Sequence, residues 1–164
     1  MNKQDFTKTM STWLESFLLK RHSNEFYIEI VIPESNFSKM PHESIKKLDA
    51  YTSFDFHTDV VGLMTNKKSG QVEVALLNRS ISAISLKEIG EMNCYSKLLK
   101  PKYSFIASLK GLPEEINLIL LSDLMENKLL KITETNHIHV FKWDAINNKI
   151  DELSLFPRKS RLLS

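Results

Sequence analysis

The segment from Asp59 to Leu77 reads DVVGLMTNKKSGQVEVALL and predicts the β-hairpin around which the fold is built. Residues 59–64 and 72–77 are short runs rich in apolar and β-branched side chains, as strands are. Residues 65–70 between them are polar and end in glycine, which is typical of a turn. Because side chains alternate between the two faces of a strand, Glu73 is expected to lie among apolar neighbours in the second strand.

Patterns of helix and strand alternate on both sides of this hairpin. Apolar residues recur at helical spacing near the start of the chain, and Ser85 with Glu88 forms a capping box that predicts the start of a later helix. In chain order, the predicted elements are a helix over 3–21, a strand over 26–32, the two hairpin strands, a helix over 85–100, a strand over 103–108, a helix from Pro113 and a strand over 137–143. The sequence leaves open whether a short helix forms over residues 42–48. Helical connections favour parallel pairing, whereas a hairpin is antiparallel, so the sequence predicts an α/β fold with a mixed β-sheet flanked by helices.

The composition is that of one ordinary globular domain spanning residues 1–164. The chain has 22 Lys and Arg residues against 20 Asp and Glu, 42% hydrophobic residues and a single cysteine. These values argue against disorder, a disulfide scaffold and a multi-cysteine zinc site. No apolar run approaches the roughly 20 residues that cross a bilayer, and the polar start of the chain does not resemble a secretory signal. We therefore expect a cytoplasmic protein without a membrane segment, whose net charge of +2 allows nucleic-acid binding without arguing for it.

Two carboxylates of the hairpin are the first candidates for chemistry. Asp59 opens one strand and Glu73 lies within the other, in apolar surroundings where an ionised carboxylate is costly unless it is paired or bound to a metal. If the turn is centred on residues 67–68, Leu63 lies opposite Glu73, and Asp59 shares the face of Glu73 but is displaced along the strand. Two converging carboxylates suit Mg²⁺ or Mn²⁺, which can activate water for phosphodiester hydrolysis.

The order of elements around Asp59 and Glu73 resembles the PD-(D/E)xK nuclease superfamily, the fold of many restriction endonucleases, over residues 13–108. The resemblance implies a restriction-endonuclease-like αβββαβ core with an added helix and strand, in which both acids bind the metal. It also implies a lysine two residues after the second acid, but the sequence there is Glu73-Val74-Ala75, so alanine stands at the lysine position.

The resemblance implies further site residues on the flanking helices. Some members of the superfamily take the missing lysine from the helix after the hairpin, where Lys87 is the candidate. Glu91 and Tyr95 in that helix resemble the Gln-x-x-x-Tyr motif of RecB-like nucleases, with glutamate in place of glutamine. Glu15 in the first helix is the candidate for an additional metal ligand.

Each candidate also has an ordinary structural interpretation. Asp59 can be a strand-start acid that accepts hydrogen bonds from local backbone amides, and Glu73 can face solvent on a half-exposed strand. Lys87 can form a surface pair with Glu91 at i,i+4 spacing. Glu15 lies at the border of the apolar stripe of its helix, where a solvated side chain is common. Tyr95 falls at helical spacing with apolar residues and can be a core aromatic.

These patterns lead to three functional hypotheses. The first is a metal-dependent DNA endonuclease that uses Mg²⁺ or Mn²⁺ to direct water at a phosphodiester bond and acts on duplex DNA as a homodimer. The second is a catalytically inactive nuclease-like module that binds nucleic acid or a protein partner, for which Ala75 is the best sequence feature. The third is an interaction module that shares only the element order.

Overall fold

The structure, a computed structural model, describes residues 1–34, 36, 39, 42–46, 48, 57–126 and 138–157, without the side chains of 123–126. Its centre is a six-stranded sheet in which the strands are neighbours in the order β1-β2-β3-β4-β5-β6. The strands are β1 (Phe26–Val31), β2 (Val60–Asn66), β3 (Val72–Ser80), β4 (Tyr103–Ser108), β5 (Ile138–Asp144) and β6 (Lys149–Phe156). Strands β1 to β3 pair antiparallel, β3 to β5 parallel and β5 with β6 antiparallel. The predicted mixed α/β fold is confirmed.

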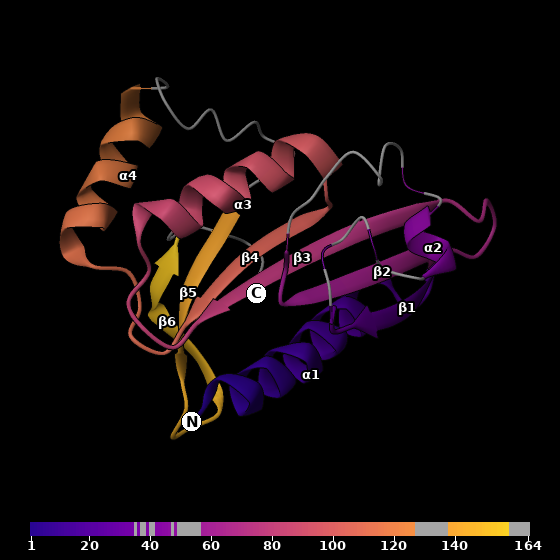
Figure 1. Ribbon diagram of the computed structural model, residues 1–164, viewed down its shortest axis with the longest axis horizontal. Helices are drawn as coiled ribbons and strands as arrows, with labels where there is room; N and C mark the ends of the chain where they lie inside the picture. The colour runs from indigo at the N-terminus through magenta and orange to yellow at the C-terminus, as the bar shows by residue number, and fades with distance from the viewer. Residues whose placement is uncertain are drawn as a thin grey trace.

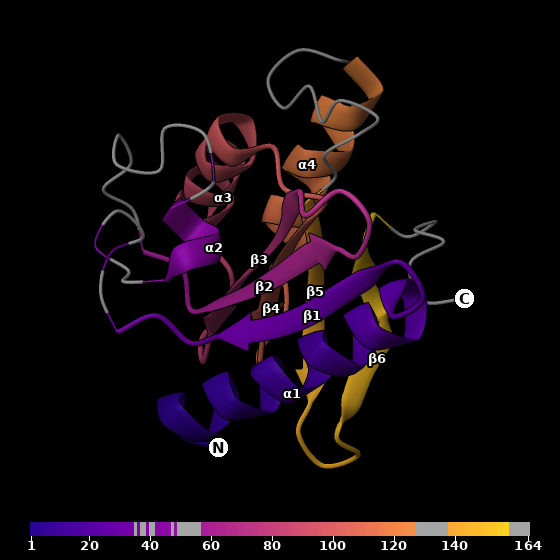
Figure 2. The same ribbon diagram turned by 90° about the vertical axis from the view of Figure 1, so that its right-hand side faces the viewer.

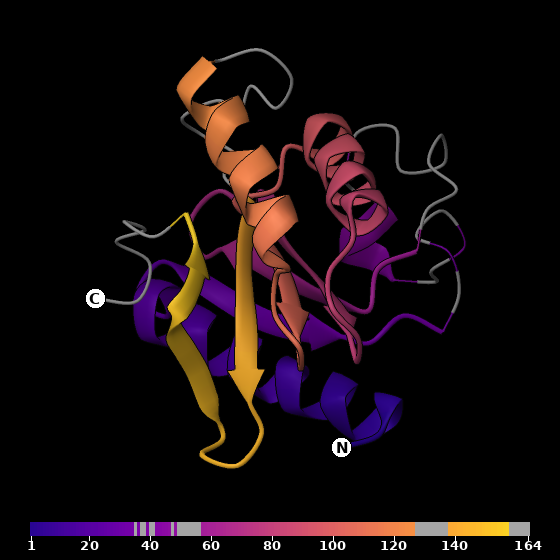
Figure 3. The same ribbon diagram turned by 90° about the vertical axis from the view of Figure 1, so that its left-hand side faces the viewer.

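Helices cover both faces of this sheet (Figures 1 and 2). The helices are α1 (Lys3–His22), α2 (Glu43–Lys46), α3 (Leu86–Leu99) and α4 (Glu114–Glu126). Helix α1 lies alone on one face, whereas α3 and α4 stand side by side on the other (Figure 3). Among the described residues, no helix has both the length and the apolar character needed to cross a membrane. The fold is therefore a sheet between two helical layers.

The core on the α1 face depends on a close approach between helix and sheet. Buried Phe6, Met10 and Leu14 project from α1 into this core. A Cβ atom built on Gly62 of β2 would lie 2.5 Å from Leu18 Cδ1 of α1, inside van der Waals contact. Gly62 therefore lets the backbone of the sheet meet α1.

The core on the other face is formed by α2, α3 and α4. Buried Ile45, Ile89 and Leu120 come from these three helices in turn. Helix α3 begins where the capping box predicts, since Glu88 Oε2 accepts a hydrogen bond from the Ser85 backbone N–H at 2.7 Å. The last predicted strand matches β5, although its expected first residue, His137, lies outside the described residues.

The hairpin register differs by one residue from the expected one. Met64, not Leu63, lies opposite Glu73. Asn66 Oδ1 accepts hydrogen bonds from the backbone N–H groups of Lys68 and Ser69 at 2.9 and 3.0 Å, and the Asn66 N–H donates to Gln71 at 2.8 Å. These contacts hold residues 67–70 as the loop and centre the turn on residues 68–69 instead of 67–68. A one-residue change of register alters the partner of every side chain in the hairpin.

Candidate functional site

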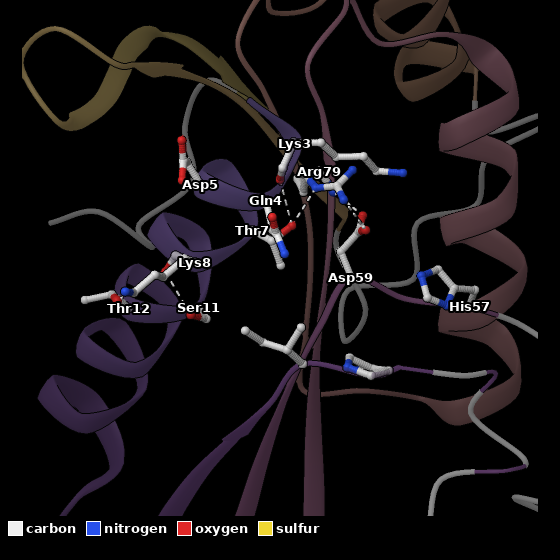
Figure 4. A pocket seen from close by; sticks show the side chains of 12 residues that line it. Lys3, Gln4, Asp5, Thr7, Lys8, Ser11, Thr12, His57, Asp59 and Arg79 are labelled. Carbon is white, nitrogen blue, oxygen red and sulfur yellow. Dashed lines mark hydrogen bonds and ion pairs between the residues drawn. The ribbon is translucent and has the colours of Figure 1, made fainter. Parts of the chain in front are cut away.

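Asp59, at the start of β2, lies against Arg79 near the end of β3. Arg79 Nη2 is 3.1 Å from Asp59 Oδ1, and the backbone N–H of Arg79 donates to Asp59 Oδ2 at 2.8 Å. The side chains of Arg79 and Asp59 are only 10% and 15% exposed. Both oxygens of the carboxylate are therefore engaged by one residue of the neighbouring strand, as Figure 4 shows.

Helix α1 completes this arrangement from the side. Arg79 Nε donates to Thr7 Oγ1 at 2.8 Å, and that hydroxyl donates in turn to the Lys3 carbonyl at 3.0 Å. The Asp59 N–H donates to Asn78 Oδ1 at 3.3 Å, which ties the residue before β2 to β3. Asp59 and Thr7 thus hold the guanidinium of Arg79 from two sides. A pair held by this many contacts is a preorganised structural unit.

An open groove of about 970 Å³ runs beside this ion pair, between the first turns of α1 and the ends of β1, β2 and β3. We call it the Asp59 groove; its charged and hydroxyl-bearing lining residues are Lys3, Asp5, Thr7, Lys8, Ser11, Thr12, His57, Asp59 and Arg79. Figure 4 shows these side chains gathered on both sides of the opening. Lysine ammonium groups and hydroxyls bind phosphate oxygens well, so the groove has the chemistry of an anion site beside a neutralised carboxylate.

Glu73 lies at the other end of β3. It is six residues from Arg79 in the same strand, which is about 20 Å at the usual rise of a strand. Its Oε2 pairs with Lys102 Nζ at 2.7 Å. The structure therefore does not bring Asp59 and Glu73 together. The expected placement of Asp59 on the face of Glu73 is wrong as well, because Met64 lies opposite Glu73 and counting back by twos from Met64 reaches Val60 instead of Asp59.

The candidates on α3 lie on the opposite face of the sheet from α1. Lys87 Nζ is 3.8 Å from Glu91 Oε1 and its side chain is 83% exposed, which fits the surface-pair interpretation. Tyr95 packs against the core beneath α3. Burial, and next the nearby Glu91 carboxylate, raise the pKa of Tyr95. None of the three lines the Asp59 groove, although Tyr95 interacts with the backbone of His57, two residues before Asp59.

Glu15 is exposed on α1 and is absent from the lining of the Asp59 groove. Within the part of the chain that the structure describes, no three His, Cys, Asp or Glu side chains are grouped so that they could hold a metal ion.

Sequence reasoning missed Arg79 and Thr7. The second hairpin strand was expected to end at Leu77, but β3 continues to Ser80 and carries Arg79 past the start of β2. The sequence feature that could have identified Arg79 is the polar stretch Asn78-Arg79-Ser80 directly after the apolar strand. A strand that extends beyond the start of its antiparallel partner can place a charged side chain beside the partner's first residues.

Comparisons of this chain with protein-family models, with characterised proteins and with solved structures each find no match. The functional inference therefore rests on the geometry and charge of the Asp59 groove.

Proposed function

We propose that this chain is a catalytically inactive module, similar to PD-(D/E)xK nucleases, that binds nucleic acid in the Asp59 groove. The observation that carries the proposal is the ion pair between Asp59 and Arg79. The resemblance implies that an acid followed two residues later by a lysine should stand beside Asp59. In the observed register the β3 residues beside it are Leu77-Asn78-Arg79, so leucine takes the position of the acid and arginine that of the lysine.

The residues of the Asp59 groove do not fit the magnesium ion that the resemblance implies. Such an ion is held by one or two carboxylates with free oxygens, together with water and substrate phosphate. Among the described residues that line the groove, the carboxylates are Asp59 and Asp5; Arg79 engages both oxygens of Asp59, and Figure 4 shows Asp5 turned away from it. The buried side chain of Leu77 offers no ligand. An arginine in permanent contact with the acid replaces the charge that a metal would supply.

Nucleic acid is the proposed ligand because of the charges at the groove. Lys3 and Lys8 line it from α1 without an ion pair to any described residue, and the hydroxyls of Ser11 and Thr12 lie along the same helix. Phosphate contacts of this kind position a nucleic acid without reading its sequence. The cytoplasm, expected from the sequence, is a compartment in which such a ligand is abundant.

A metal-dependent DNA endonuclease is the second candidate. It is favoured by the position of Asp59 in an open groove of about 970 Å³, which is large enough for a sugar-phosphate group. Activity would require Arg79 to release Asp59 and another acid to approach, for example from a second copy in a homodimer. Cleavage assays separate the two candidates.

The test combines cleavage and binding by wild type, Asp59→Asn and the double variant Lys3→Gln/Lys8→Gln. Supercoiled plasmid, single-stranded DNA and a branched junction are incubated with Mg²⁺ or Mn²⁺, with EDTA as the control. We expect no metal-dependent cutting, and binding of labelled DNA that weakens in Lys3→Gln/Lys8→Gln. The matched control is Lys110→Gln/Lys149→Gln, which removes two exposed cations outside the groove. Nicking that is lost in Asp59→Asn would overturn the proposal in favour of the endonuclease.

A further inference from the structure

Cationic side chains gather at the end of the molecule opposite the Asp59 groove. Three turns meet there: the connection from α1 to β1, the β2–β3 turn and the connection from α3 to β4. We call this surface the basic end; its cations are Lys20, Arg21, Lys67, Lys68, Lys97, Lys100 and Lys102, and the acids of the same segments are Glu25 and Glu73. The positive charge of this surface exceeds the net charge of +2 of the whole chain, so the rest of the molecule is net acidic.

Direct contacts join the three turns. Lys67 Nζ donates to the Ser23 carbonyl at 2.6 Å, which links the β2–β3 turn to the end of α1. The Tyr103 hydroxyl lies 2.8 Å from His22 Nε2, which links the start of β4 to the same helix end. Figure 2 looks onto this side of the molecule, with the end of α1 and the β2–β3 turn toward the viewer. The basic end is therefore one continuous surface that crosses all three layers of the fold.

Several cations of the basic end are available to a ligand. Lys102 forms an ion pair with Glu73, with Nζ 2.7 Å from Oε2. Lys67 donates to the Ser23 carbonyl and lies over the Tyr27 ring. By contrast, Lys20, Lys68 and Lys97 are exposed and form no ion pair with any described residue. Exposed cations without ion-pair partners at one end of a molecule create a positive potential that attracts a polyanion.

We propose that the basic end is a second phosphate-contact surface, so that one nucleic acid lies along α1 from the Asp59 groove to the basic end. The inference rests on the proposed function. Lys3 and Lys20 are 17 residues apart on α1, which is about 26 Å at the rise of a helix. That length corresponds to about eight base pairs at roughly 3.4 Å each. Two cationic surfaces at the ends of one helix therefore fit a rod-shaped polyanion of this length, and the vesicle arm of the test separates it from a plane of lipid headgroups.

The test measures the binding of fluorescein-labelled DNA and RNA duplexes of 6 and 20 base pairs as a function of salt. The test variant is Lys20→Glu/Lys68→Glu, which reverses two exposed charges, one in the last turn of α1 and one in the β2–β3 turn. The control variant is Lys110→Glu/Lys149→Glu, which reverses two exposed charges outside the basic end and the Asp59 groove. Vesicles containing phosphatidylserine provide a separate arm with anionic lipid.

We expect wild type and control to bind the 20-base-pair duplex at least tenfold more tightly than the 6-base-pair duplex. Lys20→Glu/Lys68→Glu should lose most of this advantage, and its slope of log affinity against log salt should decrease in magnitude by about 2. Equal binding by this variant and the control would overturn the proposal that the basic end contacts phosphates, and it would leave the proposal for the Asp59 groove standing. The basic end would also be refuted if Lys3→Gln/Lys8→Gln were the one variant to lose binding, since the Asp59 groove would then account for the binding. Absence of duplex binding by wild type would refute the proposed function as well, and binding to vesicles alone would make the basic end a membrane surface.

Discussion

Removal of Arg79 is the sharpest test of the ion pair that defines the site. Arg79→Met keeps most of the length of the side chain but leaves the Asp59 carboxylate without its cation and Thr7 without one hydrogen bond. Breaking a buried pair from one side costs about 3–5 kcal/mol, and a neutral hydrogen bond is worth about 1 kcal/mol. Because the Arg79 backbone N–H still donates to Asp59 after the substitution, we expect a loss of about 2–3 kcal/mol in the free energy of unfolding.

The assay is urea denaturation, read as a change of midpoint at constant m-value. The variants Asp59→Asn and Arg79→Met/Asp59→Asn complete a double-mutant cycle, in which we expect a coupling of about 1–2 kcal/mol between the two side chains. An exposed pair provides the matched control: Glu43 and Lys46 lie 2.8 Å apart with side chains 81% and 44% exposed, and Glu43→Gln should change the stability by less than about 0.5 kcal/mol.

The reasoning fails if Arg79→Met costs no more than Glu43→Gln, or if the cycle gives no coupling between Asp59 and Arg79. Either result would mean that the carboxylate is stable without its cation. The Asp59 carboxylate would then be available as a metal ligand, and the endonuclease would become the favoured function.

Two further predictions concern the packing and the pH dependence of the fold. Gly62→Ala should lower the free energy of unfolding by about 1–3 kcal/mol, because the new methyl group meets Leu18 Cδ1 at 2.5 Å. Gly90→Ala in α3 meets nothing within 4 Å and should be neutral or stabilising by up to about 1 kcal/mol, so equal losses in the two variants would contradict the packing argument. Burial, and next the charge of Lys102, lower the pKa of His22, so the unfolded chain binds a proton more readily and stability should decrease as the pH falls from 7 to 5. His22→Gln should flatten that part of a urea-midpoint profile, and an unchanged slope would show that His22 does not contribute to it.

The hairpin and the flanking elements were predictable because their signals are local. Capping by Glu88, the turn residues after Asn66 and the helical spacing of Phe6 and Met10 act within a few residues of the chain. The mixed sheet followed from these elements, because a hairpin pairs its strands antiparallel and helical connections join strands in parallel. Strand β6 escaped prediction, although Asn148, in a left-handed conformation with φ of 51°, marks the turn before it.

The site depended on distances that no local pattern contains. Asp59 was singled out from the sequence, but its partner was decided by the register of the hairpin, which hydrogen bonds at Asn66 set. The sequence by itself determined most of the elements and placed Asp59 and Glu73 on the strands of the hairpin. Only the tertiary structure decided that Asp59 meets Arg79 and that Glu73 meets Lys102, because a small shift of the turn changes every partner across the hairpin, and the helix and strand packed alongside supply the other contacts.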